Sequence, residues 1–73
     1  MAGTDVHTVH KNGAWINEVG GEQVDGNYAT KETAIAAGRE LAMRNKSEHV
    51  IHGLDGQIHE RSSYGHDPRD TRG

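Results

Sequence analysis

The stretch from Thr30 to Asn45, TKETAIAAGRELAMRN, decides the fold of this chain. Its small and apolar residues recur three and four positions apart, which places them on one face of a helix. That face consists of Ala34, Ala37, Gly38, Leu41 and Ala42. Thr30 suits the N-cap, because its hydroxyl can accept from a free backbone N–H of the first turn. Since the face is built from Ala and Gly, we expect the helix to lie close to the surface it covers.

Short runs with β-strand character lie on both sides of the helix. They are Val6–His10, Trp15–Val19 and Glu22–Tyr28 before it, and Glu48–Gly53 and Gln57–Arg61 after it. Asn12-Gly13 and Asp55-Gly56 separate neighbouring runs and are strong hairpin-turn signals. The third run is weaker, because Gly26 interrupts it. The order β-β-β-α-β-β predicts an α+β fold, a small antiparallel sheet with one helix packed across one face.

Composition indicates one domain with a thin core. The chain has 73 residues, of which only eleven are Leu, Ile or Val, and it has no Phe and no Cys. It can form no disulfide and no Cys-based zinc site. We expect a single domain over residues 6–68, between a flexible N-terminus (1–5) and a disordered tail (69–73). A domain this small buries limited surface, so we expect it to associate with itself as a homodimer.

The net charge and the hydropathy of the chain bear on two classes of function, nucleic-acid binding and membrane insertion. The formal net charge is −3, whereas strong non-specific nucleic-acid binders carry a basic footprint. A local basic patch stays possible on these grounds. No stretch approaches the eighteen apolar residues of a membrane span, and no secretory signal opens the chain. A cytoplasmic protein without membrane contact fits these features.

Histidine is enriched, with six in 73 residues. His7/His10 and His49/His52 are spaced i, i+3, which on a strand directs the two members to opposite faces. A three-histidine metal site would therefore need ligands from different strands, such as His7, His52 and His59. The alternative is that these are ordinary half-exposed strand residues.

Catalytic signals are missing from the sequence. It has no Gly-x-Ser-x-Gly elbow, and its Gly20-Gly21 pair lacks the Lys-Ser/Thr of a phosphate loop. The carboxylates on the strand runs fit a solvated sheet face better than an acid–base pair. We therefore expect no enzymatic activity and no cofactor.

Two aromatic residues are candidates for binding. Trp15 is the largest apolar group, and we expect it beneath the helix; the alternative is an exposed tryptophan on a binding face. Tyr64 opens the segment YGHDPR, which either folds back to hold Tyr64 on the sheet or forms an aromatic–basic patch with nearby arginines. The candidate binding residues are Tyr64, His66, Asp67, Arg69, Arg61 and Trp15, with Tyr28 and Arg72 as further nucleic-acid contacts.

Five short motifs resemble a known family when taken in order. They are HTV at residues 7–9, GAW at 13–15, ATKETAI at 29–35, VIHGLDGQI at 50–58 and YGHDP at 64–68. The chain is similar in these motifs to DUF2188, a family of small bacterial domains of unknown function. Position 14 carries Ala where the family pattern has a second Gly. The resemblance implies a small stand-alone domain and implies no activity.

The sequence thus favours a non-enzymatic binding or interaction module that forms a homodimer. Two alternatives stay open. One is nucleic-acid binding through sheet aromatics and tail arginines, and the other is a histidine-based metal site.

Overall fold

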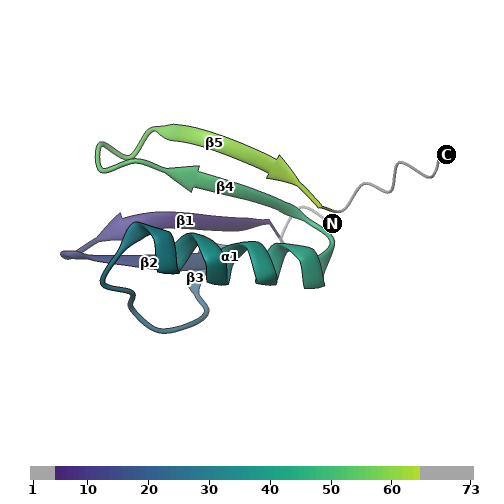
Figure 1. The fold of residues 1–73 in the computed structure, drawn as a ribbon, viewed down its shortest axis with the longest axis horizontal. Coiled ribbons are helices and arrows are strands. Elements are labelled where there is room, and N and C mark those ends of the chain that lie inside the picture. Colours follow the sequence, from purple (N-terminus) through teal and green to yellow (C-terminus); the bar gives the residue numbers. More distant parts are fainter. Residues whose placement is uncertain (1–4, 65–73) are drawn as a thin grey trace, which may run out of the picture.

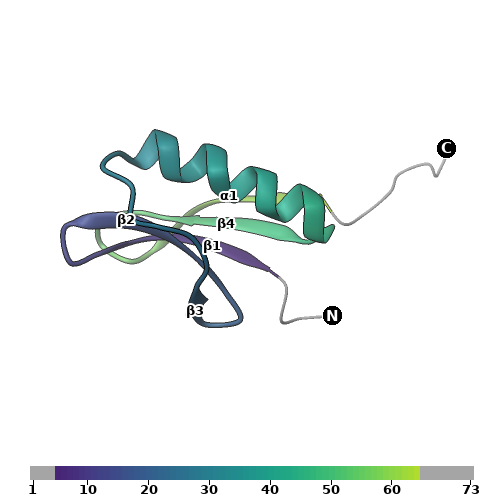
Figure 2. The same cartoon turned by 90° about the horizontal axis from the view of Figure 1, so that it is seen from below.

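A five-stranded sheet with one helix across one face makes up residues 5–64, the part of the chain that this computed structural model describes (Figures 1 and 2). The elements are β1 (Val6–Lys11), β2 (Ala14–Val19), β3 (Glu22–Gln23), α1 (Lys31–Asn45), β4 (Glu48–His52) and β5 (Ile58–Ser63). The strand order in the sheet is β3-β2-β1-β4-β5. The predicted α+β fold is confirmed. α1 is too short and too polar to cross a bilayer.

The third strand is much shorter than predicted. The sequence suggested Glu22–Tyr28, but β3 covers only Glu22–Gln23. The chain then leaves the sheet and returns at Tyr28, whose backbone forms an isolated antiparallel bridge with Trp15 through N–O contacts of 2.8 and 2.9 Å. Asp25 holds this excursion in place, because its carboxylate accepts from the Tyr28 hydroxyl at 3.0 Å.

One strand pair differs from the predicted antiparallel sheet: β1 and β4 run parallel, with Val6 beside His49 and Thr8 beside Ile51. The bridge at Tyr28 explains the direction. It makes α1 begin at the Trp15 end of the sheet, and fifteen helical residues then span about 22 Å to the opposite end. The chain therefore enters β4 at the end where β1 also begins.

The turn between β1 and β2 and the start of α1 follow the local sequence signals. Asn12 and Gly13 both have positive φ, 54° and 81°, as the two-residue turn between β1 and β2 requires. The Thr30 hydroxyl accepts from the Thr33 N–H at 3.2 Å and caps α1. At the other end Lys46 takes the left-handed conformation, with φ 53°, and its N–H bonds to carbonyls of the last turn. A lysine thus fills the position that glycine usually occupies.

Polar side chains lie at the centre of the helix–sheet interface. α1 buries Ala34, Gly38 and Ala42 against the sheet. Beneath them three residues of three different strands are almost fully buried, Thr8, Asn17 and His49. A Cβ atom on Gly38 would lie only 2.6 to 2.8 Å from polar atoms of these side chains. The absence of a side chain at Gly38 therefore allows the helix to approach the sheet this closely.

Hydrogen bonds join this buried cluster to itself and to the helix. The Thr8 hydroxyl donates to Asn17 Oδ1 at 2.5 Å, so it can only accept at its 2.7 Å contact with His49 Nε2. His49 must then carry its proton on Nε2. The Asn17 amide donates to the Ala34 carbonyl at 3.0 Å. Because these buried groups satisfy one another, the cluster stabilises a single helix position instead of destabilising the core.

Replacing Gly38 with alanine should destabilise the protein. Alanine favours a helix by about 1 kcal/mol over glycine, but its methyl group would collide with the cluster, and overpacking costs about 1–3 kcal/mol. We expect Gly38→Ala to lower the free energy of unfolding in urea titrations. Gly26→Ala is the control, because nothing lies within 4 Å of a Cβ there. A Gly38→Ala variant as stable as the Gly26→Ala variant would contradict this packing.

The cluster should also make stability depend on pH. Burial lowers the pKa of His49 below its ordinary 6.5; Arg39 and His7 act in the same direction, and Glu60 opposes them. Between pH 6.5 and the lowered value, the unfolded chain binds a proton that the folded protein does not. The free energy of unfolding should therefore fall as the pH drops below about 6.5, by at most about 1.4 kcal/mol per pH unit from this residue.

Urea titrations of the wild type and His49→Gln between pH 5 and 8 measure this contribution. Glutamine keeps an amide donor for Thr8 but does not titrate. We expect the variant to lose stability less steeply on acidification. Equal slopes for the two proteins would show that His49 does not titrate as its burial requires.

Candidate functional site

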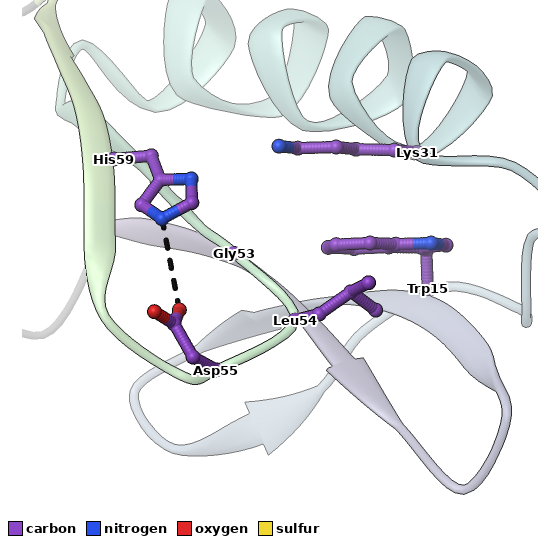
Figure 3. A pocket seen from close by; sticks show the side chains of 6 residues that line it. All are labelled: Trp15, Lys31, Gly53, Leu54, Asp55 and His59. Atoms are coloured by element: carbon purple, nitrogen blue, oxygen red, sulfur yellow. Dashed lines mark ion pairs between the residues drawn. The ribbon is translucent and has the colours of Figure 1, made fainter.

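A pocket of about 410 Å³ opens between the start of α1 and the β4–β5 hairpin. Its lining residues come from three places in the sequence: Trp15, Lys31, Gly53, Leu54, Asp55 and His59 (Figure 3). Ligand pockets in proteins commonly measure about 300–1,000 Å³ and are mostly apolar with a few polar groups. The size and the composition of this pocket match that description.

Trp15 and Lys31 form one side of the pocket. Trp15 lies on the helix side of β2 and is only 8% exposed, as the sequence predicted. Lys31 is the first residue of α1, and its ammonium nitrogen lies 5.5 Å from the centre of the Trp15 ring. A cation over an indole face is attracted by the negative electrostatic potential of that face. The bridge between Tyr28 and Trp15 brings these two residues together, because α1 begins three residues after Tyr28.

The β4–β5 hairpin forms the opposite side. Its turn is closed by Gly53 N–H to the Gln57 carbonyl at 2.9 Å. His59 lies across the pocket from Trp15 in Figure 3, and its Nε2 is 3.6 Å from Asp55 Oδ1. A Cβ atom on Gly53 would collide with the His59 ring, so the imidazole depends on glycine at that position. Leu54, at the hairpin tip, is 74% exposed.

The charges of the pocket are unevenly paired. The Asp55 carboxylate accepts from the Gln57 N–H at 3.1 Å and also faces His59. Lys31, in contrast, has no carboxylate within ion-pair distance among residues 5–64. A partly apolar pocket with such a cation can hold a ligand. The six lining residues include no Ser, Thr or Cys that could act as a nucleophile.

A second arrangement of polar side chains lies on the helix-free face of the sheet. His7 Nδ1 and His52 Nε2 are 2.9 Å apart. His52 Nδ1 lies 3.1 Å from the Gly56 carbonyl, which can only accept, so Nδ1 must carry the proton. His52 Nε2 then accepts from His7, and the neutral pair leaves His7 Nε2 as a free acceptor.

The predicted metal ligands come together only in part. His7 and His52 meet, but His59 lies in the pocket on the helix side of the sheet. Over the described range, no three His, Cys, Asp or Glu side chains are grouped so that they can hold a metal ion. The predicted set of His7, His52 and His59 is therefore wrong as a single site.

The predicted binding residues are also divided. Trp15 lines the pocket, whereas Arg61 lies on the opposite face of the sheet, 3.9 Å from Glu48. Tyr64 is half-buried, and its N–H donates to the Ser47 carbonyl at 3.0 Å. His66, Asp67, Arg69 and Arg72 lie outside the described residues.

Sequence reasoning missed four of the six pocket residues. Gly53, Leu54 and Asp55 fall in a segment that was interpreted only as a strand and a turn, and Lys31 was regarded only as part of the helix opening. One signal was available: Leu54 is an apolar residue placed between Gly53 and the Asp55-Gly56 turn, where a solvent-exposed loop has no need for leucine. Its partners could not be identified before the helix start was placed beside Trp15.

Comparison with known proteins gives a family without a described activity. The family model of an uncharacterized protein conserved in bacteria, DUF2188, matches residues 6–64. No curated protein and no solved structure matches the chain. The matched range ends at Tyr64, so the remainder of the YGHDP motif extends beyond it. The match covers most of the sequence, and the chain belongs to the DUF2188 family of uncharacterized bacterial proteins.

Proposed function

We propose that this protein is a non-enzymatic binding module that holds a small ligand in the pocket between α1 and the β4–β5 hairpin. The main support is the position of Leu54: a large apolar side chain, 74% exposed, lines a pocket whose other wall is a buried tryptophan. Covering Leu54 with a ligand removes apolar surface from water, which is favourable.

The exposure of the Asp55–His59 pair favours binding over catalysis. These two side chains are 57% and 52% exposed, so water screens their interaction. Catalytic groups usually act where water is excluded and a nucleophile or a polarising group is close. The open pocket supplies recognition surface without such an enclosure.

The proposal predicts that small molecules bind at this position and depend on Leu54. A fragment library screened by ¹H–¹⁵N NMR should give hits that move the signals of Gly53, Leu54 and the Trp15 indole N–H. Leu54→Ala removes part of the apolar contact, and we expect about tenfold weaker binding, corresponding to about 1.4 kcal/mol. Gly53→Ala should weaken the same hits, because its methyl group displaces His59.

Two control variants match these changes. Met43→Ala also removes an exposed apolar side chain, 54% exposed, but lies far along α1 from the pocket. Gly26→Ala adds a methyl group where no atom is near. Hits that scatter over the surface, or that respond equally to Leu54→Ala and Met43→Ala, would overturn the proposal.

The edge of the sheet supports self-association as a second function. β5 is an outer strand of six residues, whereas the opposite outer strand, β3, has two. An outer strand offers backbone donors and acceptors to another chain. We propose that a second copy pairs with β5 in the antiparallel direction.

Charge disfavours two registers for that pairing. Opposite residues of an antiparallel pair lie on the same face, so the two-fold axis lies between one residue of β5 and the same residue of the second copy. Centring on Glu60 or Arg61 would place like charges opposite each other. A register centred on Ser62 avoids this repulsion, because it places Arg61 opposite Ser63 of the second copy.

Sedimentation equilibrium over a wide concentration range tests this pairing. We expect the mass of the wild type to rise toward that of a dimer. Ser63→Lys should keep the protein monomeric, because each new lysine faces Arg61 of the other copy. Gln57→Lys adds the same charge outside the strand and should leave the dimer intact. A wild type that stays monomeric throughout would exclude the homodimer.

The other predicted functions have less support. Surfaces that bind single strands combine aromatic rings with basic residues, whereas Trp15 and Arg61 lie on opposite faces of the sheet. The His7–His52 pair provides two metal ligands, fewer than stable zinc sites use. Nucleic-acid binding, metal binding and a cytoplasmic location stay predictions.

A further inference from the structure

The unpaired charge in the pocket identifies the class of ligand. Lys31 has no carboxylate within ion-pair distance among residues 5–64, and the Asp55 carboxylate instead accepts from the Gln57 N–H and lies 3.6 Å from His59 Nε2. A ligand that enters this pocket therefore meets an unpaired ammonium group. Charge complementarity favours an anionic group, which can accept a charge-assisted hydrogen bond from Lys31.

The position of Lys31 is already defined before a ligand arrives. Its ammonium nitrogen lies 5.5 Å from the centre of the Trp15 ring. In Figure 3 the lysine side chain runs along the indole with its charged end directed toward His59. An anion bound to this ammonium group would lie on the side of the pocket that faces His59.

The walls of the pocket favour a flat ligand. The indole of Trp15 and the imidazole of His59 lie on opposite sides, and Leu54 adjoins Trp15 (Figure 3). Gly53 lies at the base, where the lack of a side chain gives room for the His59 ring. Aromatic rings pack well against other aromatic rings in stacked or edge-to-face arrangements. A planar ring between Trp15 and His59 gains these contacts, and a bulkier saturated ring does not.

We propose that the pocket binds a planar ring that carries a carboxylate or a phosphate. The anionic group bonds to Lys31, and the ring packs against Trp15, Leu54 and His59. This inference rests on the proposed binding function and adds the chemistry of the ligand to it.

Four related probes separate charge from shape: 2-naphthoate, 2-naphthyl phosphate, 2-naphthamide and decahydro-2-naphthoate. The chain has a single tryptophan, so the indole N–H signal in ¹H–¹⁵N NMR titrations reports directly on the pocket. We expect naphthoate or naphthyl phosphate to bind about tenfold more tightly than the neutral amide. The saturated carboxylate should bind more weakly than naphthoate. The comparison of carboxylate with phosphate shows which anion the site prefers.

Charge variants assign the effect to one residue. Lys31→Gln should abolish the advantage of the anions over the neutral amide. Lys46→Gln makes the same change of net charge at the other end of α1 and should preserve the advantage. Both substitutions are at the surface of the helix or its cap, and the NMR spectrum itself shows whether each variant is folded.

Three results would contradict the inference in distinguishable ways. If the amide binds at Trp15 as tightly as naphthoate, the pocket is a binding site but not an anion site. If Lys46→Gln weakens the anions as much as Lys31→Gln does, the attraction belongs to the whole molecule. If no probe moves the Trp15 signal and the fragment screen also gives no hits at the pocket, the binding function itself is wrong.

Discussion

The contact between Gly38 and the buried cluster of Thr8, Asn17 and His49 is the constraint on which the rest of this structure depends. The core contains few large apolar side chains, and the small residues on the buried face of α1 interlock little with the sheet. Their shape alone therefore does not define the position of the helix. Here three strands each supply a polar side chain, and their hydrogen bonds extend to the Ala34 carbonyl of the helix. A buried polar group without a partner costs roughly 1–3 kcal/mol. A shifted helix would break the bond between the Asn17 amide and the Ala34 carbonyl and would move Gly38 away from the cluster, so one helix position is strongly preferred.

The pocket follows from that helix position. With the middle of α1 held at Gly38, the direction of the helix is set by the Tyr28 bridge to Trp15, and its first residue must lie beside the indole. Lys31 is that residue. The parallel placement of β4 next to β1 then returns the β4–β5 hairpin to the same end of the sheet. Trp15, Lys31 and the hairpin residues are thus far apart in the sequence but adjacent in space for one shared reason, the route of the chain around the sheet.

Local signals predicted much of the fold. The Asn12-Gly13 turn, the Thr30 cap and the Ala–Gly face of the helix each depend on neighbouring residues alone, and all were found as expected. The direction of β4 and the early end of β3 depend on long-range pairing, for which alternating residues give no signal. The site was predicted least well. Of the pocket residues only Trp15 and His59 had been considered, the latter as a metal ligand. His49 had been considered as a strand histidine, whereas its role as a buried donor arises only from the register that brings it to Thr8.

The protonation state of His49 tests the central claim most directly. Its imidazole can be observed in the intact protein by long-range ¹H–¹⁵N correlation spectra, which distinguish the two neutral tautomers from the charged ring. The hydrogen bonds of Thr8 require a proton on Nε2 of His49, and burial favours the neutral ring because it lowers the pKa. We predict this single tautomer at neutral pH, and its persistence at a pH where exposed histidines are already charged. A charged ring at neutral pH, a neutral ring with its proton on Nδ1, or the averaged signal of an imidazole in water would show that the cluster does not hold the helix as described.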